Sequence, residues 1–577
     1  MTRYGGMFAL VVAAFAVVIF LFGMVTLPPA KSSVKSLERS KKNELVIRGA
    51  FHVHSNESDG SGSLEDIAEA AAQANLDFVI LTDHGDGTRQ TDRSKYQSGV
   101  LCINAVELST TGGHLIALDL QKTPYPLGGE PSDVAEDVTR LGGMGIVAHP
   151  ESVRAELRWD DWSATFEGME WLNADSQWRD EGITRLTQAL FHYLFRPPET
   201  IASLFDRPIK NLDRWDSLTK NKQVVGLAGS DAHARIGIWP RRSDENIKSI
   251  IRFPSYEQTF KALTIRVQIN EPLVGNAVSD AEVLFRGIRA GRIYTIIDAS
   301  GDVQKFTFTA RSGSVTTGMG GRLKSDGTVT IDANIENASV ETRIVLLKDG
   351  GILAVEQGSN LTYTTATYSG VFRVEGWLKG KFETPPIPWL VSNPIYVGDY
   401  DDKSAINVVR DNVKISGTLV EDADMTNWVI EKDPESQVSV RSFDPLHPSM
   451  LQLDYKLSKR KAKSAYAAVV HSVIVNAAKH DRIVFSGRSD RPMRLAVQLR
   501  LSAESSIERW QRSVYLDESF REITVYFDQM KPIGQTNIKR FRLMDVRALL
   551  FVIDTLNTRT GTPGAVSLKN VRMVGKQ

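Results

Sequence analysis

The feature that most constrains this chain is a recurrence: between residues 44 and 300, short apolar runs end one after another in histidine, aspartate or glutamate. The first run is Leu45-Val46-Ile47, which leads into His52-Val53-His54. Because strand side chains alternate with a period of two, both imidazoles are expected on one face of a strand. Two imidazoles side by side form half of a metal site, and carboxylates must complete it.

Later apolar runs supply those partners. Short runs typical of buried strands alternate with helical stretches, of which Ser63 to Asn75 is the clearest, with Ser63 and Asp66 as a capping-box start. This alternation predicts a parallel α/β barrel or a doubly wound sheet, and the C-terminal strand ends of a barrel gather on one face. The acidic and histidine residues at or near these run ends are Asp59, Asp83, His84, Glu107, His149, Asp231 and His233.

His114 does not follow this pattern. It stands before its apolar run, Leu115 to Leu118, instead of after it. We therefore expect a loop or a reversed strand to bring His114 to the face where the other residues gather.

Taken as an ordered set, these motifs resemble the PHP superfamily, which is named for polymerase and histidinol phosphatase. The resemblance covers residues 44–300 and implies a distorted (β/α)7 TIM-like barrel that holds two or three divalent metal ions, either zinc, manganese or iron. The absence of sulfur ligands agrees with these metals. The motifs are His52-Val53-His54-Ser55, Ser58-Asp59-Gly60, Thr82-Asp83-His84, Glu107, His114, Ala148-His149-Pro150 and Gly229-Ser230-Asp231-Ala232-His233.

The resemblance also implies how the ligands divide among the metals. One metal would be held by His52, His54, Glu107 and Asp231. Glu107 would bridge to a second metal held by His114 and His149, and the third would be held by Asp59, His84 and His233.

A metal-bridged hydroxide would then hydrolyse a small-molecule substrate. We expect a phosphoesterase acting on a small phosphorylated substrate. The alternatives are a carbamate, amide or ester hydrolase, and a membrane-tethered glycan-binding protein with a vestigial barrel. Asp83 would orient a ligand or cap a strand, and Arg89 and Arg235 would contact an anionic group or lie in solvent. Glu170, Trp171 and Asn173 are weaker candidates for substrate contact.

Two β-rich segments follow the barrel. Residues 301–400 alternate like an Ig-like β-sandwich, and their final stretch, Ser392 to Val397, resembles that of CehA/McbA-type metallohydrolases. Residues 410–577 resemble a galactose-binding-like jelly-roll β-sandwich, similar to carbohydrate-binding modules, which makes a glycan a candidate partner.

The N-terminal segment, residues 1–43, contains an apolar run from Met7 to Leu27 and a basic linker. About 20 apolar residues match a membrane-spanning helix, so we expect a membrane anchor. The basic residues after the run favour a cytoplasmic barrel, but a single N-terminal span and the appended β-rich segments favour export. We therefore expect an extracytoplasmic protein, in the periplasm or at the surface of a bacterium. The zero net charge gives no reason to expect nucleic acid as a partner, and the single cysteine excludes an internal disulfide.

Overall fold

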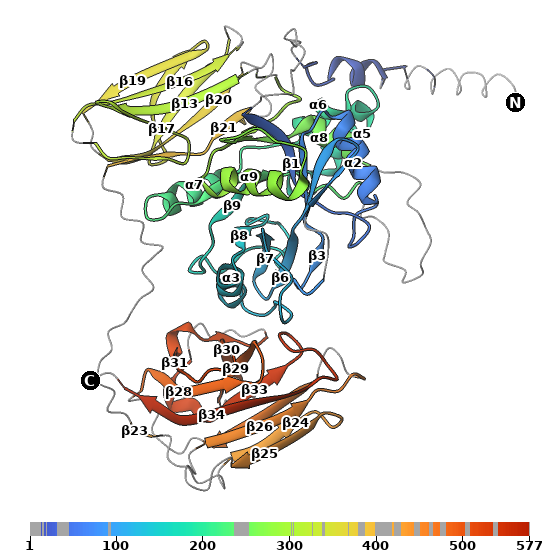
Figure 1. Cartoon of the computed structure of the whole chain (residues 1–577). Coiled ribbons are helices and arrows are strands. Elements are labelled where there is room, and N and C mark those ends of the chain that lie inside the picture. The colour runs from blue at the N-terminus through green and yellow to red at the C-terminus, as the bar shows by residue number, and fades with distance from the viewer. Residues whose placement is uncertain are drawn as a thin grey trace, which may run out of the picture.

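The computed structural model describes most of the chain between residues 45 and 575 and a short part before it. The described residues are 13, 17–18, 20–31, 45–89, 94–235, 253–301, 303, 305–325, 327–336, 338, 341–366, 369–378, 387–398, 418–419, 428–442, 450–460, 465–472, 480–501, 508–534 and 541–575. Figure 1 shows a body of mixed helices and strands above a separate lobe of strands.

Several strands of residues 45–301 belong to a long mixed sheet. At its centre, β1 (Val46–Val53), β2 (Phe78–Leu81) and β5 (Val100–Asn104) are parallel neighbours. Antiparallel strands extend this set on both sides: β4 (Ser94–Gln97) beyond β5, and β11 (Thr264–Gln268) and β12 (Ile293–Ile296) beyond β1.

A second sheet has the order β10-β9-β8-β7-β6-β3. Strands β8, β9 and β10 are parallel, whereas β7 is antiparallel to both β6 and β8. The bounds are β3 (His84–Gly85), β6 (Val106–Thr110), β7 (Gly113–Leu118), β8 (Met144–Val147), β9 (Gly168–Asn173) and β10 (Val225–Gly229).

The two sheets meet at the strand ends. The chain passes from β2 to β3 through Thr82 and Asp83, and from β5 to β6 through Ala105. Near the other junction, an isolated bridge joins Val53 to Ala232, and the Ser230 amide donates to the Phe51 carbonyl at 2.8 Å. The hydrogen bonds therefore divide the strands between two sheets, and the predicted single barrel is not confirmed.

The reversed strand β7 has a simple cause. Only Thr111 and Gly112 separate β6 from β7, and so short a connection joins antiparallel strands, because a parallel pair needs a long crossover. One of the two arrangements that we expected for His114, a reversed strand, is the one observed.

Helices cover the sheets. The predicted helix after Ser63 is confirmed as α2 (Leu64–Gln73), including the reciprocal Ser63–Asp66 capping box. Helix α2 contacts β2 and β5, α9 contacts β5 and β11, and α3 contacts β7 and β8. The remaining bounds are α3 (Pro131–Arg140), α4 (Ala174–Arg179), α5 (Ile183–Tyr193), α6 (Pro197–Ser203), α7 (Ile209–Thr219), α8 (Tyr256–Ala262) and α9 (Ala277–Arg289).

The segment after residue 301 shares a sheet and a core with the first part. Strand β21 pairs with β12, and buried side chains such as Phe306 and Leu390 belong to the same apolar core as Ile296. A four-stranded sheet, β14-β13-β16-β19, completes this segment. The bounds are β13 (Lys305–Ser312), β14 (Val315–Gly318), β15 (Arg322–Leu323), β16 (Val329–Glu336), β17 (Arg343–Lys348), β18 (Gly351–Gln357), β19 (Asn360–Thr365), β20 (Gly370–Trp377), β21 (Leu390–Ser392) and β22 (Ile395–Val397).

The last lobe is built from two six-stranded sheets around a core of its own. We call it the C-terminal sandwich. Its strands are β23 (Thr418–Leu419), β24 (Trp428–Lys432), β25 (Gln437–Ser442), β26 (Met450–Lys456), β27 (Tyr466–Ser472), β28 (Arg482–Ser489), β29 (Met493–Leu501), β30 (Arg509–Leu516), β31 (Arg521–Tyr526), β32 (Lys531–Pro532), β33 (Val546–Asp554) and β34 (Pro563–Val574).

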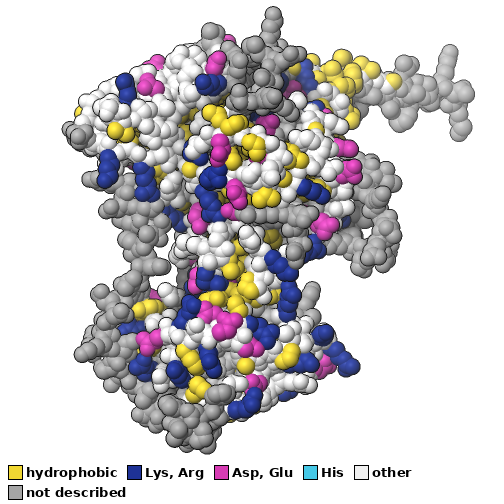
Figure 2. All heavy atoms as spheres, viewed as in Figure 1, with side chains coloured by type: hydrophobic (Ala, Val, Ile, Leu, Met, Phe, Trp, Pro, Cys, Tyr) yellow, Lys and Arg dark blue, Asp and Glu magenta, His cyan; other side chains and the backbone are white. Residues whose placement is uncertain are grey.

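The sandwich lies against α3 through a buried set of charges, which we call the docking network: Asp133 and Asp137 of α3 with Arg494 and Arg512 of β29 and β30. Arg494 Nη1 donates to Asp137 Oδ1 at 2.5 Å, and Arg512 pairs with Asp133. The Ser513 amide donates to Asp133 Oδ2 at 3.1 Å. Figure 2 shows acidic and basic side chains gathered where the two lobes meet.

The predicted membrane anchor, Met7 to Leu27, falls partly outside the described residues. Within the described part of the chain, no helix has both the length and the apolar character needed to cross a membrane. Of the predicted linker that follows, residues 28–31 are described, and residues 32–43 lie outside the described residues.

Candidate metal centre

The structure brings together all nine residues predicted as metal ligands. They form four overlapping groups, and within each group the nitrogen and oxygen donor atoms lie within 4.8 Å of one another. The groups are His54, Asp59, His84 and His233; His52, His54 and Glu107; His52, His149 and Asp231; and His84, Glu107 and His114.

His52 and His54 converge by a route that differs from the predicted one. The pairing of β1 with β2 shifts register between Ala50 and Val53, and His52 has a φ of 63°, in the left-handed region. The regular strand alternation expected from the sequence is therefore interrupted at the first ligand. The two Nε2 atoms nevertheless lie 3.2 Å apart.

Left-handed backbone recurs at other ligands. His149 has a φ of 29° and Asp231 a φ of 47°. Non-glycine residues avoid this region because the side chain clashes with the backbone, at a cost of about 1–3 kcal/mol each. Such strain persists where the surrounding fold holds it, and three of the nine non-glycine residues with a positive φ in the described part of the chain are ligands of this centre.

Glu107 lies at the middle of the centre and is 1% exposed. Its Oε1 lies 2.8 Å from His114 Nδ1 and 2.9 Å from His149 Nε2. Its Oε2 lies 3.3 Å from His52 Nε2 and 3.2 Å from His54 Nε2. Burial raises the pKa of Glu107, but the surrounding imidazoles outweigh it and hold that pKa well below its ordinary value.

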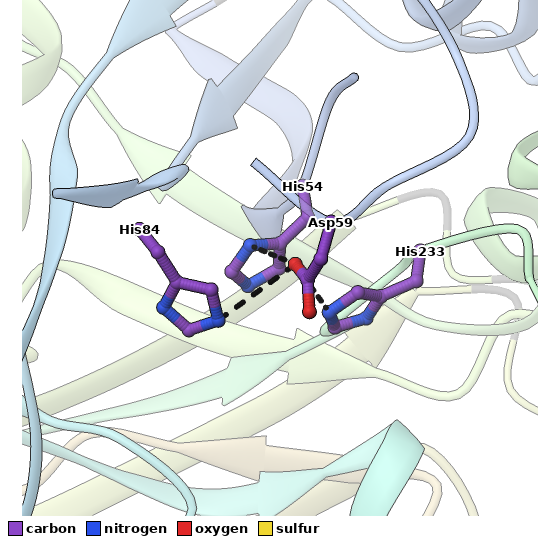
Figure 3. A group of neighbouring side chains, drawn as sticks. All are labelled: His54, Asp59, His84 and His233. Carbon is purple, nitrogen blue, oxygen red and sulfur yellow. Dashed lines mark ion pairs between the residues drawn. The ribbon is translucent and has the colours of Figure 1, made fainter. Parts of the chain in front are cut away.

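Asp59 forms the second focus (Figure 3). Its Oδ1 faces three imidazole nitrogens, at 3.2 Å from His233, 3.5 Å from His54 and 3.7 Å from His84. This oxygen is buried and has no hydrogen-bond partner among the described residues. Burial raises the pKa of Asp59, but the nearby imidazoles, His233 above all, lower it more, and the net shift is downward.

Asp231 completes the arrangement. Its Oδ1 lies 3.3 Å from His52 Nε2 and 3.4 Å from His54 Nε2. Burial lowers the pKa of His52, but Asp231, Glu170 and Glu107 raise it well above its ordinary value.

These residues fit divalent metal ions. Several lone-pair atoms point at one another: the Nε2 atoms of His52 and His54 face each other, and Asp59 Oδ1 is buried without a donor. A cation between such atoms would satisfy all of them at once. Imidazole and carboxylate ligands without sulfur suit zinc, manganese or iron.

The grouping differs in detail from the division among metals that we predicted. His149 groups with His52 and Asp231, and His84 groups with Glu107 and His114 as well as with Asp59. Because several residues belong to two groups, the groups do not count the metals.

Glu170, on β9, is the residue whose role sequence reasoning missed. It was a candidate for substrate contact, but it is 0% exposed. Its Oε1 lies 2.7 Å from His52 Nδ1, while Oε2 accepts from the His149 amide at 2.7 Å and from Asn173 Nδ2 at 2.8 Å. Glu170 therefore orients two ligands, as carboxylates behind metal-bound histidines do.

Trp171 also differs from expectation. It is 1% exposed and belongs to the apolar core, and its Nε1 donates to Thr295 Oγ1 at 3.1 Å. The sequence signal that distinguishes Glu170 from its neighbours is an acidic residue within the apolar run Gly168 to Leu172.

Asp83 holds the loop that carries Asp59. Its Oδ1 accepts from the Ser55 amide at 2.8 Å and from Ser58 Oγ at 2.5 Å, and its Oδ2 accepts from Ser55 Oγ at 2.6 Å. The structure thus places Asp83 behind the ligands, in contact with the loop between His54 and Asp59.

The two predicted arginines lie in solvent. Arg89 is 62% exposed, and its Nη1 pairs with Glu57 Oε2 at 3.2 Å. Arg235 is exposed directly after the loop that holds His233. Neither contacts a predicted ligand among the described residues.

Comparison with solved structures finds similar folds in several proteins, two of which are described next. A two-domain protein from Bacteroides vulgatus, described as containing a predicted PHP-like metal-dependent phosphoesterase, is 12% identical, with a TM-score of 0.28, over 63% of this chain and 99% of its own. A family 11 carbohydrate-binding module of a Clostridium thermocellum cellulase is 16% identical, with a TM-score of 0.24, over 28% of this chain and 97% of its own. No protein-family model and no curated protein matches the chain.

Proposed function

We propose that this protein is a metal-dependent hydrolase, and specifically a phosphoesterase that acts on a small phosphorylated substrate. The observation that carries the proposal is the convergence of nine nitrogen and oxygen donors, from strand ends far apart in sequence, on a buried centre around Glu107. When bound, two or three divalent metals supply Lewis acidity and an activated water.

The residues of the chain provide the rest. The imidazoles and carboxylates hold the cations, Glu170 orients His52 and the His149 backbone, and Asp83 holds the loop with Asp59. Such outer contacts fix ligand geometry before the metal arrives.

Charge favours phosphate over a neutral substrate. The ligands include three carboxylates, Asp59, Glu107 and Asp231. Glu170 behind His52 adds a fourth carboxylate, and an activated water adds one further negative charge. Three divalent cations would supply six positive charges, so a centre loaded with three metals is net positive. A phosphate monoester complements that charge, whereas a carbamate or amide does not. Membership of the CehA/McbA type and an extracytoplasmic location stay predictions.

The test uses the purified full chain loaded with manganese or zinc. We expect turnover of an aryl phosphate in preference to an aryl carbamate, together with bound metal by elemental analysis. His54→Ala should lose both, and His480→Ala is the matched control, because His480 is a buried histidine in the C-terminal sandwich. Turnover of the carbamate alone would favour the alternative hydrolase, and absence of both turnover and metal would favour the vestigial barrel.

A further inference from the structure

A cleft of about 570 Å³ lies between the C-terminal sandwich and the part of the chain that holds the metal ligands. One wall comes from the part of the chain that holds the metal ligands and includes Asp86, Ser109 and Leu127. The other wall is the loop after β33, from Thr555 to Thr560, and includes Leu556 and Arg559.

The first wall is continuous with the metal ligands. Gly85 and Asp86 directly follow His84. Ser109 Oγ lies 3.4 Å from His114 Nε2. A molecule in this cleft therefore lies beside two ligands of the centre.

The second wall is held in place by a buried amide. Asn557 is 7% exposed, and its Nδ2 donates to the Pro126 carbonyl at 3.1 Å and to the Gly128 carbonyl at 3.0 Å. The Leu127 amide in turn donates to the Asp86 carbonyl at 2.9 Å. Hydrogen bonds thus connect the sandwich loop to the loop that follows His84.

Arg559 is the one cationic side chain among the residues that line the cleft. It is exposed, and no ion pair or hydrogen bond involves its guanidinium within the described part of the chain. The lining acid, Asp86, is already engaged, because its Oδ1 accepts from the Thr88 amide at 2.9 Å and from Thr88 Oγ1 at 2.6 Å. Four residues that carry hydroxyl groups also line the cleft: Ser109, Thr555, Thr558 and Thr560.

We propose that the sandwich is part of the substrate site, and that Arg559 binds an anionic group of the substrate away from the bond that is cleaved. An exposed, unpaired guanidinium facing a hydroxyl-lined cleft is suited to a carboxylate or phosphate. The substrate class is then a phosphate ester with a second anion on its leaving group. This inference rests on the proposed function.

The experiment measures binding, so that it does not depend on turnover. Phenylphosphonate and its 3- and 4-carboxy derivatives, which cannot be hydrolysed, are titrated calorimetrically into the manganese-loaded full chain. We expect at least one carboxylated probe to bind the natural protein about tenfold more tightly than phenylphosphonate, the effect of one charge-assisted contact of about 1.4 kcal/mol.

Arg559→Ala and Arg559→Gln should lose this advantage and bind phenylphosphonate within about twofold of the natural protein. Arg441→Ala is the matched control, since Arg441 is 63% exposed on the other sheet of the sandwich and its loss changes the net charge equally. Metal content should be the same in all variants.

Equal binding of all three probes by the natural protein would overturn the inference and leave the proposed function standing. Loss of the advantage in Arg441→Ala as large as in Arg559→Ala would also overturn it, because the effect would then be long-range. If no phosphonate binds the metal-loaded protein, the proposed phosphate site fails and the inference fails with it.

Discussion

Two buried clusters of charge lie in this molecule, and they differ in how their charges are satisfied. In the docking network, Arg494 and Arg512 supply the cations that Asp133 and Asp137 need. In the metal centre, no lysine or arginine contacts Glu107, Asp59 or Asp231 among the described residues, and imidazoles surround them instead. The docking network contains its own cations, whereas the imidazoles and carboxylates of the metal centre offer ligands to a cation.

Backbone geometry shows the same contrast. Three ligands of the metal centre have a positive φ, and none of the four residues of the docking network does. At the metal centre, a positive φ costs about 1–3 kcal/mol per residue and positions the ligands. At the docking network, the four charged residues pair from strands and a helix of ordinary backbone geometry, so no such strain is needed.

The largest expected effect comes from Glu107→Gln. The amide cannot accept all the bonds of the carboxylate and removes a charge from the centre. We expect loss of bound metal and a fall in aryl phosphate turnover of more than about a hundredfold, since even the partners behind ligands contribute 10–100-fold. The matched change Asp137→Asn, in the docking network, should leave metal content unchanged, and equal losses in both would erase the distinction between the clusters.

Arg494→Ala should show the reverse pattern. Arg494 is 2% exposed, and its removal leaves Asp137 with Arg140 as its cationic partner, so the cost should lie at the lower end of the range for a broken buried pair. Breaking a buried pair costs about 3–5 kcal/mol, which urea unfolding of the full chain would measure. Metal content should stay intact. A cost no larger than that of the exposed Arg441→Ala would contradict the role assigned to the docking network.

Metal removal should destabilise one cluster alone. Chelation leaves the carboxylates and imidazoles of the centre facing one another, and metal restored at a hundred times its dissociation constant should return about 2.7 kcal/mol of stability. Thermal unfolding with and without chelator measures this difference. The same increment is expected in Arg494→Ala, and its absence there would mean that the two clusters are coupled.

Glu170→Gln sharpens the comparison within the centre. The change keeps the shape of the side chain but weakens its hold on His52 and on the His149 amide. We expect metal affinity and turnover to fall about 10–100-fold, with a smaller loss than in Glu107→Gln. Measured metal dissociation constants for both variants decide the order, and an inverted order would make Glu170 a ligand.

The smallest effect is expected from Arg89→Ala. The pair with Glu57 is exposed on both sides, and pairs of this kind contribute about 0–1 kcal/mol. Unfolding stability should hardly change, and turnover should stay within about twofold if Arg89 lies in solvent during the reaction. A large rise in KM would instead indicate that Arg89 contacts an anionic group of the substrate, which is the other role that we expected for it.

The sequence was informative wherever a ligand ends a strand. His149, Asp231 and His233 follow buried strands, and their chemistry is legible from residue type and position. The role of Glu170 was not predicted correctly. Its residue type distinguishes it from the residues beside it in β9, but the sequence does not show which residues of other strands its side chain contacts. The face is decided by the pairing of β9 with β8 and β10, which local pattern does not determine.

The position of the C-terminal sandwich was even harder to predict from the sequence. Its strands could be predicted, but its place against α3 could not, because Arg494 and Asp137 are 357 residues apart and each looks like an ordinary surface charge in sequence. The docked face of β29 and β30 is covered by α3, so a glycan, which we considered as a partner, would need another surface.

By itself, the sequence determined which side chains can hold metal and that strands would carry them, because donor chemistry and strand periodicity are local properties. Only the tertiary structure decided that His52 turns on a left-handed bulge, that Glu170 lies behind two ligands, and that Asn557 and Arg559 close a cleft beside His84. Those outcomes depend on packing between segments that lie far apart in the sequence. The free energy of such contacts depends on both segments, so it cannot be predicted from the local sequence of either one.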